Sequence, residues 1–539
     1  MTTSQQGLPI PPMKWDAWGD PARTTELSAS QLSMVNDLLK VSAADVSAVA
    51  REDVRLRPSS LTDDDRAALE AVVGSAYLST ADADRLPRAG GKSTPDLLRR
   101  KSADEQDAPD AVVLPGTDEE VVALLNVCTE REIAIVPFGG GTSVVGGLDP
   151  VRGSFHAVIS LDLRRFDQLE ELDEVNQWAV LGAGLTGPAA EELLSAQGFE
   201  LGHYPQSFRY ATIGGFAATR SSGQDSAGYG RFDEMVRGLR IVTPRGVLEV
   251  GRPGPKNAAG PDLRQLFLGS EGLFGVITAV RLRVHPLPKA KAYEAWQFPD
   301  FATGASALRA AEQLGTGATV LRLSDEVETA LNLATVADAG DQQQQGGCLS
   351  ITVFEGEPEL VAERHSATRA VMIAHGGTSL GADKAKQWEA HRYDGPYLRD
   401  PLLANGALVE TLETVTSWSN AAALKQAVTE TIQAKFAEYD SLSLVLCHIS
   451  HVYDTGTALY FTVIGAQRGD AIAQWQDIKA AINDTLMSHG GSITHHHAVG
   501  ADHRNWMTDE IGEIGVDILR AVKATLDPAG ILNPGKLIP

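Results

Sequence analysis

The stretch that decides the fold of this 539-residue chain reads Pro137-Phe138-Gly139-Gly140-Gly141-Thr142-Ser143-Val144-Val145-Gly146-Gly147. It follows an apolar segment that is typical of a buried strand. A loop so rich in glycine can turn several backbone N–H groups inward and form a nest for a diphosphate, to which Thr142 and Ser143 add hydroxyl donors. The loop lacks the lysine of a GxxxxGK(S/T) phosphate loop, and its glycines do not open a helix as those of a Rossmann fingerprint do. A glycine-rich hairpin turn is the alternative interpretation of this stretch by itself.

Two further segments, residues 205–223 and 269–277, also combine glycines with hydroxyl side chains. Three such loops in one part of the chain suit a long, bent ligand that carries two phosphates. The surrounding pattern indicates one α+β domain over residues 105–288. It opens with a strand at Ala111–Pro115, a helix at Thr117–Arg131 and a strand at Ile133–Pro137, which is the beginning of a βαβ unit.

The rest of the chain divides around this domain. Residues 1–104 carry polar helical patterns, with helices expected at Ser28–Val41 and Thr62–Val73, and are interpreted as a helical extension. Prolines 286 and 288 indicate an exit from the first domain into a second one over residues 289–489. Residues 490–539 form a last segment, with a helix expected at Thr508–Thr525.

Composition excludes several classes of protein. With 43% apolar residues and a formal net charge of -24, the chain is expected to be a well-cored globule that binds neither nucleic acid nor anionic lipid by charge. Three widely spaced cysteines, Cys128, Cys348 and Cys447, suggest neither disulfides nor a cysteine metal site. The N-terminus has no signal-peptide pattern and no apolar run is long enough to cross a bilayer, so a cytoplasmic location is expected.

Three consecutive histidines, His495, His496 and His497, follow Gly490-Gly491-Ser492-Ile493-Thr494. The β-branched approach predicts a short strand that enters a turn, with His495 and His497 on one face. Such a run concentrates acid/base and anion-binding capacity. A solvated polar turn and a structural metal site are the alternatives.

The three glycine segments resemble the flavin contacts of the vanillyl-alcohol-oxidase type FAD-binding superfamily, and the closing Asp527–Lys536 stretch resembles its C-terminal signature. The resemblance implies an α+β fold: a two-subdomain FAD-binding domain of this (PCMH) type, a substrate or cap domain on an antiparallel sheet, and the helical N-terminal extension. The diphosphate loop has no histidine or cysteine, which implies non-covalent FAD. The implied cofactor contacts are Pro137, Phe138, Gly139, Gly140, Gly141, Thr142, Ser143, Gln206, Ser207, Thr212, Gly214, Gly215, Ala218, Thr219, Arg220, Ser221, Glu271, Gly272, Gly275, Val276 and Ile277.

From Met13 onward the chain also resembles the alkyldihydroxyacetonephosphate synthase family. The motifs include Lys14–Gly19, Asp225–Gly230, Arg322–Asp325, Tyr397–Asp400, and His451–Gly456 with Tyr460-Phe461, followed by the histidine run. The resemblance implies that Tyr460 is the acid/base, that His495, His496, His497 and Arg322 serve catalysis, and that Arg399 binds the substrate.

The reaction of that family exchanges the acyl group of acyl-dihydroxyacetone phosphate for the alkyl group of a fatty alcohol. Tyr460 suits a proton transfer only if positive charge lowers its pKa from about 10. The implied partner is a small phosphate or lipid substrate, with at most peripheral membrane contact and with a homodimer as the compatible assembly.

An FAD-dependent 2-hydroxyacid dehydrogenase of the same superfamily is the alternative. Those enzymes hold a divalent metal through G-H-x-G-D-G-N-x-H and E-H-G-(I/V)-G motifs. Here His448–Tyr453 lacks the G-D-G-N core and His496–Gly500 lacks the glutamate, so no metal is predicted. A flavin-binding protein without catalysis would leave the histidines, Tyr460 and the arginines unexplained.

Overall fold

The computed structural model describes residues 11–23, 25–42, 49–252, 254–336 and 346–539. In the N-terminal extension, three helices begin where a hydroxyl side chain caps the first turn. The hydroxyls of Ser28, Thr62 and Ser93 accept hydrogen bonds from the backbone N–H three residues further on. The helices are α1 (Ala29–Leu39), α2 (Asp63–Val73), α3 (Asp82–Arg85) and α4 (Thr94–Arg100). The two helices that the sequence predicts here are confirmed as α1 and α2.

The predicted βαβ unit is confirmed in a four-stranded sheet of order β1-β2-β4-β3. Its strands are β1 (Leu78–Ser79), β2 (Ala111–Val113), β3 (Ile133–Phe138) and β4 (Ala157–Asp162), and α5 (Asp118–Glu130) connects β2 to β3. Both β2 and β3 run parallel to β4, which lies between them. The diphosphate loop therefore leaves the sheet at the carboxyl end of its edge strand β3.

A second sheet, antiparallel and of order β5-β6-β10-β8-β9, completes the flavin-domain half of the molecule. Its strands are β5 (Leu169–Asp173), β6 (Trp178–Gly182), β8 (Val236–Thr243), β9 (Gly246–Val250) and β10 (Val276–Arg283). The helices of this part are α6 (Gly187–Ser195), α7 (Ile213–Thr219), α8 (Ser226–Tyr229), α9 (Phe232–Met235) and α10 (Arg264–Phe267), and β7 (Phe199–Glu200) pairs with β11 (His285–Pro286).

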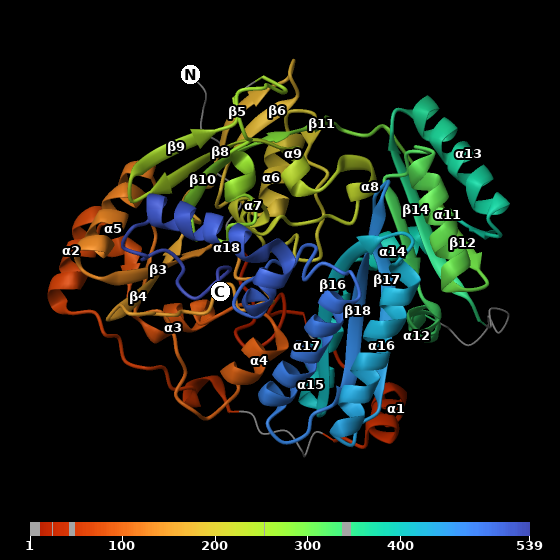
Figure 1. Ribbon diagram of the computed structural model, residues 1–539, viewed down its shortest axis with the longest axis horizontal. Helices are drawn as coiled ribbons and strands as arrows, with labels where there is room; N and C mark the ends of the chain where they lie inside the picture. The colour runs from red at the N-terminus through yellow and green to blue at the C-terminus, as the bar shows by residue number, and fades with distance from the viewer. Residues whose placement is uncertain (1–10, 24, 43–48, 253, 337–345) are drawn as a thin grey trace.

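The second half of the chain is built on a seven-stranded antiparallel sheet of order β15-β12-β14-β13-β17-β18-β16. The strands are β12 (Ala290–Phe298), β13 (Val320–Ser324), β14 (Cys348–Gly356), β15 (Thr378–Gly381), β16 (Ala407–Ser417), β17 (Ser443–Val452) and β18 (Gly456–Ala466). The helices are α11 (Phe301–Gln313), α12 (Glu326–Val336), α13 (Pro358–Ala374), α14 (Asp383–His391), α15 (Gly395–Ala404), α16 (Ala421–Glu438) and α17 (Ala471–Ser488). Figure 1 shows this sheet on the opposite side of the molecule from β3 and β4.

The last segment returns to the flavin-domain side, where Figure 1 shows the blue helix α18 (Met507–Leu526) beside β10. Met507 and Leu537 are buried in the same apolar cluster as Phe216 and Ile277. The prediction of a short strand at the histidine run is wrong, because residues 489–499 form neither helix nor strand. The backbone N–H groups of His495, His496 and His497 donate to the carboxylate of Glu413 instead of to the backbone of a neighbouring strand.

Candidate active site

The three glycine segments meet at one place, and their glycines are required there by close packing. A Cβ on Gly139 would collide with the hydroxyl of Thr212, and a Cβ on Gly140 would collide with the carbonyl oxygen of Tyr210. A Cβ on Gly272 would lie 2.7 Å from Cγ of Pro137. The structure thus brings the predicted cofactor loops together.

The diphosphate loop also presents donors that the protein does not use. Within the described part of the chain, the backbone N–H groups of Gly140, Gly141, Thr142 and Ser143 donate to no protein acceptor. Gly140, Thr142 and Ser143 stay partly exposed, although the strand before them is almost entirely buried. Consecutive free N–H groups of this kind favour an anion such as a diphosphate.

Several predicted cofactor residues are engaged within the protein. The guanidinium of Arg220 donates to the carbonyl of Leu268 at 3.0 Å and pairs with Asp233 at 3.1 Å, which fastens the end of α7 to the third loop. Thr219 donates to the carbonyl of Gly215 at 2.9 Å. Gln206 is exposed. These side chains hold the loops in place, or face solvent, rather than crowding the diphosphate loop.

The third loop connects the flavin loops to the histidine run through Glu271. Its buried carboxylate accepts hydrogen bonds from the backbone N–H of Gly500 at 2.9 Å and of Val499 at 3.3 Å. Burial raises the pKa of Glu271 to about 7, although these two donors favour the ionised form. The main chain just after the histidines is therefore fixed relative to the flavin loops.

The histidine run itself is held by Glu413 of β16, whose side chain is fully buried. The carboxylate accepts hydrogen bonds from the backbone N–H groups of His495 at 2.6 Å, His496 at 3.0 Å and His497 at 2.8 Å. The hydroxyl of Thr494 adds a fourth at 2.6 Å. Burial opposes ionisation, yet the neighbouring histidines and the Thr494 hydroxyl hold the pKa of Glu413 well below its usual range. One carboxylate thereby aims three imidazoles.

The imidazoles form a contiguous cluster with a fourth histidine from β17. His495 lies with Nε2 at 2.6 Å from the Tyr453 hydroxyl and with Nδ1 at 2.9 Å from Nδ1 of His496. The ring of His451 contacts both of these rings. Burial lowers the pKa of His497 to about 3 and also lowers the pKa values of His495 and His496. The run is therefore a set of neutral imidazoles at neutral pH.

Tyr460 lies between two imidazoles. On β18 it is the cross-strand neighbour of both Glu413 and His448. Its ring stacks on His448 at 4.9 Å between centroids and on His496 at 6.0 Å, while His497 meets it edge-on at 5.6 Å. Burial, the largest influence, raises the pKa of Tyr460 to about 12. The lowered pKa that catalysis would need is thus absent here, and the phenol is protonated at neutral pH.

Arg322 is held in a buried ion-pair network behind Tyr460. Its guanidinium pairs with Glu328 at 2.7 Å, and the same carboxylate lies 2.8 Å from Nδ1 of His448. Although burial works against ionisation, the charges of His448 and Arg322 hold the pKa of Glu328 well below its usual range. Arg322 therefore reaches Tyr460 through Glu328 and the stacked ring of His448, and its guanidinium already has a carboxylate partner.

Arg399 lies where the N-terminal extension crosses the site. Its Nη1 donates to the carbonyl of Lys92 at 2.7 Å, while its Nε makes no hydrogen bond within the described residues and lies 3.9 Å from a carboxylate oxygen of Asp400. The positive charge of Arg399 favours the ionised form of Tyr460 and so acts against the larger effect of burial on the pKa of the phenol. A partly unsatisfied buried guanidinium near the phenol is a suitable donor to an anionic ligand.

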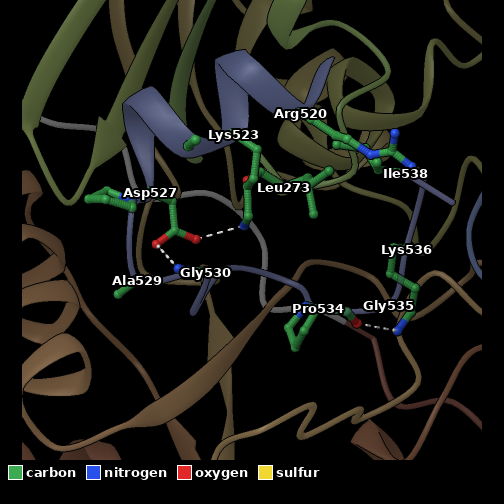
Figure 2. A pocket seen from close by; sticks show the side chains of 12 residues that line it. Leu273, Arg520, Lys523, Asp527, Ala529, Gly530, Pro534, Gly535, Lys536 and Ile538 are labelled. Carbon is green, nitrogen blue, oxygen red and sulfur yellow. Dashed lines mark hydrogen bonds and ion pairs between the residues drawn. The ribbon is translucent and has the colours of Figure 1, made fainter. Parts of the chain in front are cut away.

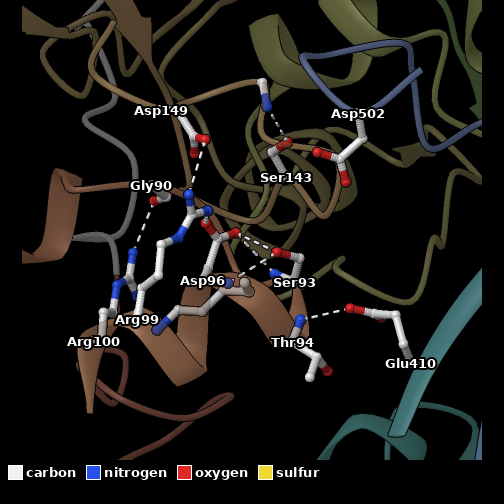
Figure 3. Close-up of polar contacts among 12 residues, drawn as sticks. Gly90, Ser93, Thr94, Asp96, Arg99, Arg100, Ser143, Asp149, Glu410 and Asp502 are labelled. Carbon is white, nitrogen blue, oxygen red and sulfur yellow. Dashed lines mark hydrogen bonds and ion pairs between the residues drawn. The ribbon is translucent and has the colours of Figure 1, made fainter. Parts of the chain in front are cut away.

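Figure 3 shows how α4 joins the two halves of the molecule at this point. The backbone N–H of Thr94 donates to Glu410 of β16 at 2.5 Å. Beside the helix, the backbone N–H of Lys92 donates to the carbonyl of Ser143 in the diphosphate loop at 2.7 Å. The extension therefore positions the diphosphate loop against the strand that carries Glu413.

The closing segment fastens the first and third loops together. The side-chain amide of Asn533 donates to the carbonyls of Gly147 at 3.2 Å and Glu271 at 2.7 Å. A hollow between α18 and this segment is shown in Figure 2, where Lys523 donates to Asp527 at 2.6 Å and to the carbonyl of Leu273 at 3.0 Å. Lys523 also donates to the carbonyl of Leu532 at 2.6 Å, so it links α18 to the third loop and to the closing segment.

Sequence reasoning missed Glu413, Glu328 and His448. Glu413 and Glu328 are acidic residues within apolar segments, and a charge at such a position signals a buried partner. His448 lies three residues before His451 on the same strand, β17. Glu413 and its histidine partners are more than eighty residues apart in the chain, and Glu328 and His448 are 120 residues apart, so these two pairings were not visible in the sequence.

Comparison with known proteins defines the class to which this fold and site belong. Residues 109–251 match the family described as "FAD binding domain", and residues 287–537 match "FAD linked oxidases, C-terminal domain". The chain is therefore an FAD-dependent enzyme with the two-subdomain flavin fold and a cap on an antiparallel sheet, as the sequence predicts.

The particular family follows from more similar proteins. The alkyldihydroxyacetonephosphate synthase of Dictyostelium discoideum is 34% identical over 474 residues, which are 84% of this chain and 77% of that protein. The one of Trypanosoma brucei brucei is 34% identical over 477 residues, with the same coverage. A solved alkyldihydroxyacetonephosphate synthase structure superposes with a TM-score of 0.82 at 30% identity, over 97% of this chain and 98% of that one. The chain belongs to the alkyldihydroxyacetonephosphate synthase family.

Proposed function

We propose that this protein exchanges the acyl group of acyl-dihydroxyacetone phosphate for the alkyl group of a fatty alcohol. The observation that carries the proposal is the position of Tyr460, which is stacked between two imidazoles within reach of the charge of Arg399. A proton donor, neutral acceptors and an anion-binding guanidinium are thereby gathered beside the flavin loops. Family membership supports the same conclusion.

The geometry divides the work among these residues. Tyr460 enters the reaction protonated, so its first role is to donate a hydrogen bond or a proton. The neutral imidazole of His497 retains one acceptor nitrogen for a proton leaving the substrate. Arg399 offers to the phosphate its Nε–H, which makes no hydrogen bond within the described residues. Arg322 and Glu328 position His448, and through it the phenol.

The described residues fit FAD. The free N–H groups of the diphosphate loop suit its two phosphates, and the loop contains no histidine or cysteine that could bind the flavin covalently. Cys128 and Cys447 are fully buried, which raises the pKa of both thiols and leaves them unreactive. FAD, when bound, supplies the nucleophilic centre that the family reaction requires. We expect heat to release it unmodified.

The partner that this proposal requires is a lipid phosphate with an apolar tail. None of the described helices is long and apolar enough to cross a membrane. A cytoplasmic enzyme that meets its substrates at a membrane surface, as a monomer or a homodimer, is consistent with the proposal.

The test is an assay of the FAD-loaded protein with acyl-dihydroxyacetone phosphate and a fatty alcohol, with the ether product measured by mass spectrometry. Tyr460→Phe should lower the rate at least about a hundredfold, because it removes the proton donor. Tyr439→Phe is the matched control, since the hydroxyl of that partly exposed tyrosine donates to Asp477 on α17. If no ether product forms and 2-hydroxyacids reduce the flavin anaerobically, the transferase proposal is wrong.

A further inference from the structure

We propose that His451, His495 and His496 form a binding site for a divalent transition metal, with zinc as the best fit. The three residues come from β17 and from the histidine run, and each offers a ring nitrogen within 4.8 Å of the other two. These three histidines do not follow the two sequence motifs by which the 2-hydroxyacid dehydrogenases of the superfamily hold a metal. The motifs therefore did not predict this site. The inference does not depend on the transferase reaction.

The spacing of the rings matches tetrahedral coordination. The three centroid separations are 4.9 Å for His451–His495, 5.2 Å for His451–His496 and 5.1 Å for His495–His496. A zinc ion about 2.0–2.1 Å from each nitrogen lies about 3.2 Å from each centroid, and tetrahedral angles then separate the centroids by roughly 5.2 Å. The rings are also steeply inclined to one another, at 41°, 61° and 84°. The ring separations therefore suit zinc, and rotation of the side chains must bring the ring nitrogens, which lie within 4.8 Å of one another, to about 3.3 Å.

The hydrogen bonds around the cage are those expected of metal-ligating histidines. Such residues commonly donate the second ring N–H to an oxygen, which fixes the ring and its tautomer. His451 has Nε2 at 3.1 Å from the carbonyl oxygen of Gly223, and His495 has Nε2 at 2.6 Å from the hydroxyl of Tyr453. The Nδ1 atoms are thereby left for an ion. Ser450, whose hydroxyl lies 2.8 Å from Nδ1 of His451, can rotate away.

The facing nitrogens of His495 and His496 give an independent reason. Their Nδ1 atoms are 2.9 Å apart, so one must carry a proton toward the other. A divalent ion would replace that single hydrogen bond by two coordinate bonds. Its charge would be offset by Glu413, whose carboxylate lies 3.8 Å from Nδ1 of His496. Arg231 is the opposing positive charge that faces these rings.

Three protein ligands leave one tetrahedral position for water or for an anionic oxygen. Because His496 also stacks on Tyr460, that position belongs to the same site as the phenol. The ion would give this protein a Lewis acid and an anion-binding centre beside Tyr460, for a phosphate or a carboxylate.

The test uses FAD-loaded protein with any affinity tag removed and with bound metal stripped by a chelator. Zinc titration followed by dialysis and elemental analysis should find one tightly held zinc per chain. His451→Gln should weaken binding at least about a hundredfold, and Tyr453→Phe about tenfold through loss of the hydrogen bond to His495. His391→Gln, on a side chain that is 66% exposed, is the control and should bind like the parent protein.

X-ray absorption at the zinc edge should show imidazole nitrogens at about 2.0–2.1 Å. Flavin absorbance and circular dichroism will establish whether each variant is folded. If His451→Gln does not fold, Tyr453→Phe still tests the proposal. Absence of stoichiometric zinc, or equal binding by the parent protein and by folded His451→Gln or Tyr453→Phe, would overturn the proposal whatever the outcome of the transferase assay.

Discussion

Replacing Glu413 by glutamine should loosen the histidine run. In the structure, one carboxylate oxygen accepts from Thr494, His496 and His497, and the other accepts from the backbone N–H of His495. An amide keeps one acceptor but turns an NH₂ group toward the second position. The His495 N–H would then face another donor in a fully buried site.

The magnitude follows from these contacts. A hydrogen bond to a charged group contributes about 1.5–3 kcal/mol, and a buried N–H left without a partner costs about 1–3 kcal/mol. The neutral amide avoids the cost of burying a charge, which offsets part of this loss. A net cost of about 3 kcal/mol is therefore expected. If the run opens locally, this raises its hydrogen-exchange rate about a hundredfold.

Hydrogen exchange of the peptide covering residues 490–500, followed by mass spectrometry, measures this cost. Glu438→Gln is the control, because Glu438 pairs with Lys435 on the surface with 60% of its side chain exposed. Because the pKa of Glu413 is depressed, its contribution is present above the carboxyl pKa of the unfolded chain and is lost only as the pH falls through the folded value. The effect should therefore be constant between about pH 6 and pH 8. Exchange in Glu413→Gln within twofold of the parent protein would refute this account.

Two further predictions concern the flavin loops. Gly140→Ala should weaken FAD binding at least about tenfold in a flavin-fluorescence titration, because the new Cβ meets the Tyr210 carbonyl, whereas Gly254→Ala, in open space, should bind normally. The pKa of Glu271 is raised to about 7 from 4.5, so its protonated form favours folding at low pH and that stability is lost as the pH rises to about 7. In urea denaturation, the free energy of unfolding of the parent protein should fall by about 2–3 kcal/mol as the pH rises to about 7, and Glu271→Gln should reduce this pH dependence. The same pH dependence in both proteins would contradict the assignment.

The sequence predicts the local elements well where a local cause fixes them. Ser28 and Thr62 begin helices because their own hydroxyls satisfy the first-turn N–H groups. The βαβ unit follows from apolar runs on either side of α5. At the histidine run the local pattern predicts a strand, because β-branched residues precede it. The structure has no strand there, because Glu413 of β16 accepts the hydrogen bonds of the histidine N–H groups.

The site shows the same division. The residue types at Tyr460, Arg322 and Arg399 could be chosen from motifs, because motifs preserve chemistry. Their protonation and pairing could not be predicted from motifs. Burial raises the pKa of Tyr460 to about 12, and Arg322 pairs with Glu328. Such effects depend on what surrounds a side chain in three dimensions.

By itself, the sequence determined the flavin fold, because the glycines at Gly139, Gly140 and Gly272 allow a close approach of neighbouring loop atoms that a Cβ would block. Only the tertiary structure decided what the histidines are. It folds β17 and β16 against the run, so that Glu413 aims three rings and His451 completes a cage of imidazoles about 5 Å apart. The physical reason is that a single residue type, glycine, is enough to indicate close packing. The electrostatic environment of a side chain and the geometry of a ligand site depend on groups that are distant in the chain.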